Sequence, residues 1–326
     1  IKFVRDAISD GLDQAFASRN GIQNVRQWSP TKPYNMTINV EMIVDDGIFK
    51  GNSTYGFTIS STKENFAVSR EELSWQGGHS LGRSQNDFSK DSNKFVRDKD
   101  GTVTIQRKIN DESLPQEILE IADDELCTPL LRTILGMPIE RQIRNFESYT
   151  IFPNTLREPQ KQSNAEYLLP HGQNLTSIIK RMRIKKKSEA IGEIIAYMRQ
   201  IVPDLENITT KAASSYIFPM FRVKPKGSKS HTFDVDQMSD GTLRILGLLV
   251  ALYQEPGPSV IALEEPELTV HPGILQLLAE AIKDVGTRRQ ILVTTHSPEL
   301  LDHFEPGQII AVKHEDGVTK ARPLNA

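Results

Sequence analysis

The sequence predicts an α/β protein built on a parallel sheet with helices on both faces. Two short, almost wholly apolar runs, at 259–263 and 290–294, have the composition of strands buried in such a sheet. A segment with helical spacing of apolar residues precedes each run, at 241–253 and at 273–285. Strands and helices therefore alternate, which favours a parallel sheet covered on both faces.

The N-terminal third has a different pattern. Apolar residues at helical spacing predict a helix over 1–17, and no capping residue precedes it, so we expect further residues upstream. Period-two alternation then predicts an antiparallel β region over about 35–107, with a hairpin turning at Asp100-Gly101. The Gly, Ser, Asn and Asp residues of 76–93 predict an exposed loop.

The middle of the chain is predicted to be helical. Helical spacing extends over 114–145, and two further helices are expected at 174–183 and 188–201. Strands are expected at 217–223 and, as a third strand of the parallel sheet, at 309–313. These patterns predict three regions: an N-terminal lobe at 1–113, a helical insertion at 114–213 and a C-terminal lobe at 214–326.

Composition sets limits on the function. The chain has 326 residues, is 38% hydrophobic and carries a formal net charge of −3, as ordinary globular proteins do. It contains no apolar run of eighteen residues, so no membrane span is expected. The single cysteine, Cys127, excludes an internal disulfide and favours a reducing cytoplasm, and its plainest interpretation is a small buried hydrophobe.

The strongest chemical feature is the run Ser259-Val-Ile-Ala-Leu-Glu264-Glu265-Pro-Glu267. It predicts two carboxylates at the carboxyl end of a buried strand, where open α/β sheets bind ligands. Glu264 could hold magnesium and Glu265 could polarise an attacking water. Taken alone, the acids could equally mark a helix N-terminus.

Two further elements accompany the acids. The run Ile291-Leu-Val-Thr-Thr-His296 predicts a strand that delivers a histidine to the same sheet edge, where it could sense a phosphate. Upstream, small residues open the helix that begins near Leu243, and their backbone N–H groups would suit an anion. By itself this helix start would be an ordinary N-cap. Its residues are Ser239, Asp240, Gly241 and Thr242.

In this order, the three elements resemble those of ABC-type ATPase heads, and the Glu-Glu-Pro-Glu run followed by Leu-Thr-Val-His271-Pro resembles the SMC/RecF/OLD branch. The resemblance implies ATP and Mg²⁺, with Glu264 acting on the metal, Glu265 as general base and His296 at the γ-phosphate. Ser239 to Thr242 would be the signature that reaches the nucleotide of a second head. The resemblance also implies a homodimer closed on ATP, acting in DNA maintenance, repair or antiviral defence, with a separate effector or nuclease.

Two features depart from the family's pattern. Glu264 stands where the wider family most often has aspartate, and no Gly-Lys-Ser or Gly-Lys-Thr of a phosphate-binding loop occurs in the sequence. We expect that loop just before Ile1. The glutamine that would line the γ-phosphate has two candidates, Gln142 and Gln160.

The run Lys180-Arg-Met-Arg-Ile-Lys-Lys-Lys187 is the most basic in the chain. It is either a solvated helix end or a contact for nucleic-acid phosphates. For the whole chain, the leading hypothesis is an ATP hydrolase. The alternative is an inactive ATPase-like scaffold that binds a partner protein or nucleic acid.

Overall fold

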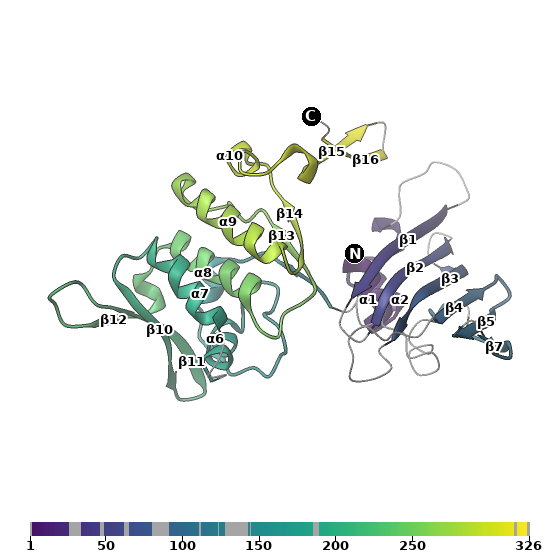
Figure 1. The fold of residues 1–326 in the computed structure, drawn as a ribbon, viewed down its shortest axis with the longest axis horizontal. Coiled ribbons are helices and arrows are strands. Elements are labelled where there is room, and N and C mark those ends of the chain that lie inside the picture. The colour runs from purple at the N-terminus through teal and green to yellow at the C-terminus, as the bar shows by residue number, and fades with distance from the viewer. Residues whose placement is uncertain are drawn as a thin grey trace. The chain divides into compact units, whose positions relative to one another are not determined.

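The structure is a computed structural model, and it describes most of the chain in two compact units (Figure 1). The first unit comprises Ile1–Asn145 with His314–Val318, and the second comprises Phe146–Lys313 with Thr319–Ala326. The described residues are 2–25, 34–45, 49–61, 65–79, 91–110, 112–122, 124–127, 143, 145–184, 189–315 and 318–324. The division between the two units falls between Asn145 and Phe146. The boundaries predicted from the sequence were different, after residue 113 and after residue 213.

The first unit contains the predicted antiparallel β region. Its sheet has the order β1-β2-β3-β4-β5, and β6 and β7 both pair with β5. The strands are β1 (Tyr34–Asp45), β2 (Phe49–Ser61), β3 (Phe66–His79), β4 (Asp91–Arg97), β5 (Thr102–Ile109), β6 (Glu112–Ser113) and β7 (Glu117–Glu120). The hairpin between β4 and β5 is confirmed, with Arg97 opposite Val103.

Three predictions in this unit were wrong. The helix expected over 1–17 is broken at Gly11, whose φ of 88° ends α1 (Lys2–Asp10) before α2 (Leu12–Ala17). The loop expected over 76–93 is strand at both ends, since β3 and β4 pair through Gln76 and Ser92. Glu117–Glu120 is a strand rather than helix, because it forms the edge of the sheet beside β5. Residues 80–90 and 128–142 lie outside the described residues.

The core of this unit lies between α1, α2 and one face of the sheet. Apolar residues of the two helices, including Val4, Ile8 and Phe16, pack on alternate residues of the strands such as Phe57 and Ile59. A short 3-10 turn, η1 (Ile22–Asn24), follows α2.

A polar cluster is buried within this core. Glu71 and Arg97 are both 0% exposed, and Glu71 accepts hydrogen bonds from the Tyr55 hydroxyl at 2.9 Å and the Cys127 N–H at 2.6 Å. Arg97 donates to the carbonyls of Glu125 and Ala122, the latter at 2.7 Å. Cys127 is buried as expected, and burial, with the charge of Glu71, raises the pKa of its thiol far above the usual range. The cluster holds Ala122 and residues 124–127 on the sheet.

Replacing Arg97 with methionine is expected to lower the free energy of unfolding of this unit by about 3 kcal/mol, because buried carbonyls lose their donors. Both tryptophans, Trp28 and Trp75, fall in this part of the sequence, so their fluorescence during urea unfolding measures the change. Arg70→Met is the control, since its ion pair with Glu72 is exposed and should contribute less than about 1 kcal/mol. Equal losses in the two variants would contradict a structural role for the cluster.

The second unit contains a three-stranded parallel sheet in the order β14-β13-β8. Its strands are β8 (Phe146–Tyr149), β13 (Val260–Glu264) and β14 (Gln290–Thr294). The last two confirm the predicted buried strands. The third strand was predicted wrongly: residues 310–315 form β15 (Ile310–Glu315), which pairs with β16 (Val318–Pro323) in a separate two-stranded sheet.

A second sheet in this unit is antiparallel, in the order β10-β11-β12, with β9 beside β11. Its strands are β9 (Gln160–Lys161), β10 (Leu205–Ala213), β11 (Tyr216–Val223) and β12 (His231–Phe233). The range predicted as a helical insertion therefore also contains strands, because β10 pairs along its length with the strand predicted at 217–223.

The helices of this unit surround α8, which is buried from Thr242 to Tyr253 and packs against α5, α6, α7 and α9 (Figure 1). A helix that is apolar on every side is a core helix. The helices and turns are α5 (Pro153–Arg157), α6 (Leu175–Ile184), α7 (Glu189–Arg199), η2 (Val235–Gln237), α8 (Asp240–Tyr253), η3 (Pro272–Ile274), α9 (Leu275–Gly286), α10 (Pro298–Leu301) and η4 (Pro306–Gln308). In the described part of the chain, none is long and apolar enough to cross a membrane.

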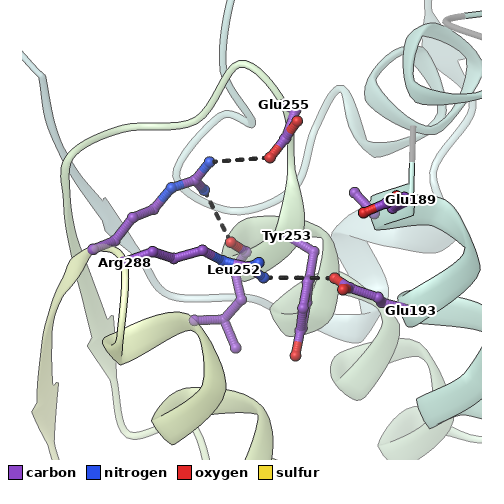
Figure 2. A pocket seen from close by; sticks show the side chains of 8 residues that line it. Glu189, Glu193, Leu252, Tyr253, Glu255 and Arg288 are labelled. Atoms are coloured by element: carbon purple, nitrogen blue, oxygen red, sulfur yellow. Dashed lines mark hydrogen bonds and ion pairs between the residues drawn. The ribbon is translucent and has the colours of Figure 1, made fainter. Parts of the chain in front are cut away.

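A small polar cavity of about 100 Å³ lies at the C-terminal end of α8 (Figure 2). Two arginines occupy it. Arg289 donates to the carbonyls of Leu252 and Gln254, and Arg288 pairs with Glu193 of α7 at 3.5 Å. A cation at the end of a helix stabilises its dipole, so these side chains fasten α7 and α8 to the segment after α9. We interpret the cavity as structural.

Candidate active site

The parallel strands bring the predicted catalytic residues to one edge of the sheet. Glu264 at the end of β13 lies opposite Thr294 at the end of β14, and Leu263 lies opposite Tyr149 at the end of β8. All three strands therefore end at the same level, where an α/β sheet binds its ligand.

Glu264 is exposed at this edge and is oriented by two hydroxyl groups from β8 and the residue after it. Ser148 Oγ donates to Glu264 Oε1 at 3.0 Å, and Thr150 Oγ1 donates to Oε2 at 2.9 Å. The sequence did not reveal these partners, because β8 itself was not predicted.

The donors around Glu264 fit magnesium. The atoms there that could bind a cation, the Glu264 carboxylate and the Ser148 and Thr150 hydroxyls, are all oxygens, and hard divalent cations prefer oxygen ligands. The described residues contain no group of three or more His, Cys, Asp or Glu side chains that could hold a metal ion. Magnesium commonly takes one or two protein carboxylates and completes its shell with water and phosphate oxygens, so a single carboxylate with hydroxyl support is sufficient.

Glu265 has an unusual backbone conformation. Its φ is 44°, in the left-handed region that non-glycine residues seldom occupy. Its N–H donates to Thr294 O at 2.9 Å, and its carbonyl accepts from Arg244 Nη2 at 2.7 Å. The peptide groups on both sides are thereby fixed. The side chain is 27% exposed, and its Oε1 lies 3.6 Å from His296 Nε2.

Glu267 ties this turn to the end of β14. Its Oε1 accepts from Thr295 Oγ1 at 2.6 Å and from the His296 N–H at 3.2 Å. The bond from the His296 N–H fixes the backbone of His296. The side chain of His296 is 96% exposed and therefore accessible to a ligand.

The two acids of the turn differ in their affinity for protons. Burial raises the pKa of Glu265, and the adjacent Glu267 raises it further, against the opposing charge of His296. Burial also disfavours ionisation of Glu267, but the hydrogen bonds from Thr295 and the backbone outweigh it and lower its pKa. A carboxylate with raised proton affinity at a sheet edge is suited to accept a proton from water.

The predicted signature lies at the start of α8. Ser239 is the N-cap and accepts from the Thr242 N–H at 3.2 Å, and its Oγ lies 2.8 Å from Thr242 Oγ1. Ser239 and Asp240 are exposed, whereas Thr242 is buried. Asp240 pairs with Arg157 at 2.6 Å. A side chain on Gly241 would come within 3.2 Å of Thr269 O, so the glycine permits the helix to approach the turn after β13.

Other sequence candidates are placed elsewhere. Gln160 is buried, donating to Gly172 O and accepting from the Thr176 N–H, so its role is structural. Gln142 lies outside the described residues. In the basic run, Arg181 and Arg183 donate to backbone carbonyls of Ala165 and Ile208, which supports a structural role for these two. Lys185, Lys186 and Lys187 also lie outside the described residues.

Comparisons with known proteins place the chain in a family. Residues 39–302 match the family described as "AAA domain, putative AbiEii toxin, Type IV TA system". No curated protein sequence matches the chain.

Among solved structures, an SMC head bound to the C-terminal winged-helix domain of ScpA is 16% identical, covers 81% of this chain and 76% of its own, and has a TM-score of 0.42. The SMC head domain of Thermotoga maritima is 9% identical, with coverages of 79% and 75% and a TM-score of 0.38. An SMC head of Pyrococcus furiosus bound to a ScpA domain is 14% identical, with coverages of 81% and 79% and a TM-score of 0.38. Because the family match spans well over half of the sequence, the chain belongs to this AAA-domain family, and the predicted ATPase-type α/β fold is confirmed.

Proposed function

We propose that this chain forms an ATP-hydrolysing head that pairs with a second copy around bound ATP. The observation that carries the proposal is the convergence of Glu264, Glu265 and His296 at one sheet edge, with Glu265 3.6 Å from His296. Phosphoryl transfer from ATP requires a metal site, a group that receives the proton of the attacking water and a donor to the γ-phosphate.

Each residue has a role in this proposal. Glu264, held by Ser148 and Thr150, would hold Mg²⁺, and the metal would supply positive charge to the phosphate oxygens. A carboxylate oxygen of Glu265 would accept the proton of the attacking water, and His296, whose Nε2 lies 3.6 Å from Glu265 Oε1, would contact the γ-phosphate. The exposed Ser239 and the N–H groups beside it contact the nucleotide held by the other head. The phosphates would also need a Lys-containing loop, and no Gly-Lys-Ser or Gly-Lys-Thr occurs in the sequence.

The cellular role is proposed more broadly. ATP-driven closure of two heads would move DNA or a separate effector, in DNA maintenance or in defence against phage. The description of the family refers to a toxin–antitoxin system, which favours the defence role. A catalytically inactive scaffold is the alternative, and the intact arrangement of Glu265 and His296 speaks against it.

ATP hydrolysis by the full-length protein tests the proposal, and we expect it to require Mg²⁺. Replacing Glu264 with glutamine should raise the Mg²⁺ concentration for half-maximal rate by at least about tenfold, because the site loses its anionic ligand. Glu280→Gln, an exposed change on α9, should leave that concentration unaltered. Turnover that persists in EDTA, or an equal response of the two variants, would contradict the assignment of Glu264.

A further inference from the structure

Arg244 is a charged side chain inside the most apolar helix of the protein. It is 2% exposed, although α8 is otherwise apolar from Leu243 to Tyr253. Burial lowers the pKa of its guanidinium, and the negative charge of Glu267 opposes the shift. Within the described part of the chain, no carboxylate lies within ion-pair distance of it. Burying a cation without an ion-pair partner costs desolvation free energy, so the hydrogen bonds of Arg244 must offset a large part of that cost.

Those hydrogen bonds join three segments that are distant in the sequence. Arg244 Nη1 donates to Ile151 O at 2.6 Å, just after β8, and Nη2 donates to Glu265 O at 2.7 Å, just after β13. Arg244 itself belongs to the helix that begins at the signature residue Ser239. One guanidinium therefore connects the signature helix to the ends of two strands at the site.

The Glu265 carbonyl, which accepts from Arg244, belongs to the residue with the unfavourable backbone conformation. A residue at φ 44° keeps this conformation only where its surroundings hold it, and Thr269, in the same turn, is also left-handed at φ 61°. Arg244 fixes the carbonyl of Glu265, while Thr294 fixes its N–H. Because the backbone of Glu265 sets the direction of its side chain, its carboxylate depends on this bond.

We propose that Arg244 is a positioning residue that holds the carboxylate of Glu265 in its catalytic orientation and links that orientation to helix α8. This rests on the proposed function, in which Glu265 receives the proton of the attacking water. Ser239 and Arg244 are separated by about 7.5 Å along one rigid helix. A nucleotide that engages Ser239 and moves the helix start therefore moves the guanidinium and the Glu265 carbonyl with it.

Arg244→Met in the full-length protein tests the proposal. We expect kcat for ATP hydrolysis to fall about 100-fold through misplacement of Glu265, with KM for ATP unchanged. Arg244→Lys should recover about tenfold of this loss, because an ammonium group can still donate to Glu265 O. Full activity of Arg244→Met, or no recovery by lysine, would overturn the proposal.

Arg289→Met is the matched control. Arg289 is also largely buried and also donates to backbone carbonyls, but at the opposite end of α8. The Arg289→Met substitution should lower the Tm of the protein, as Arg244→Met does, while kcat per folded molecule stays unaltered. An equal loss of kcat in Arg289→Met would mean that general loosening of the fold explains the effect.

Amide hydrogen exchange gives a readout that does not depend on turnover. In Arg244→Met, amides of 264–271 should exchange at least about tenfold faster than in the wild type, while those of α9 are unchanged. Unaltered exchange at 264–271 would overturn the positioning role. If instead the wild type hydrolyses no ATP, or Glu265→Gln is as active as wild type, the proposed function fails while the exchange result still decides the structural role of Arg244.

Discussion

Replacing Glu265 with glutamine is expected to lower kcat for ATP hydrolysis by about 1,000-fold while ATP affinity stays within about twofold of wild type. Glutamine has almost the same size and can keep the backbone contacts to Thr294 and Arg244. Its amide cannot accept the proton of the attacking water. The loss should therefore appear in the chemical step, and the variant should accumulate ATP-bound dimers.

Two measurements check this result: steady-state hydrolysis, and the amount of nucleotide retained on the dimer by size-exclusion chromatography. Glu280→Gln serves as the control, because Glu280 is an exposed glutamate on α9 that contacts Gln276 and not the sheet edge. If the Glu265 variant turned over ATP at the wild-type rate, the scaffold alternative would gain support and Glu265 would not be the base.

The parts of the fold that were predicted correctly are those with strong local signals. The strands β13 and β14 are short apolar runs followed by polar residues, and helix α8 has uninterrupted apolar character. By contrast, β8 has only four residues, two of them polar, and it becomes a strand through pairing with β13. The apolar residues of β15 predicted a buried strand of the parallel sheet, but Ile310 and Val312 are 61% and 67% exposed.

The same distinction applies to the candidate site. Glu264, Glu265 and His296 were found because each lies at or within two residues of the carboxyl end of an apolar strand. Thr150 could not be found, because it contacts Glu264 across 114 residues of sequence. Arg244 offered one signal, a single charge within an apolar helix. Its partners, two backbone carbonyls, leave no mark in the sequence.

Replacing Ser239 with arginine is expected to abolish ATP-driven pairing and to reduce hydrolysis by at least about 100-fold, because a bulky cation would occupy the exposed helix start that meets the second head. The change also removes an N-cap, which costs about 1 kcal/mol of stability. Asp234→Ala removes the N-cap of η2 instead, and it should leave pairing and turnover near wild type.

Mixing the two inactive variants tests whether the signature acts on the other head. In a mixed dimer, the Ser239→Arg protomer supplies an intact Glu265 and the Glu265→Gln protomer supplies an intact Ser239, so one of the two sites is complete. The mixed dimer carries one arginine at the paired surfaces instead of two, so pairing is partly restored. Up to about one quarter of wild-type activity, the value for fully random pairing, should return. If each site were contained within a single chain, the mixture would stay as inactive as its components, and Ser239 would have to act on the nucleotide of its own head.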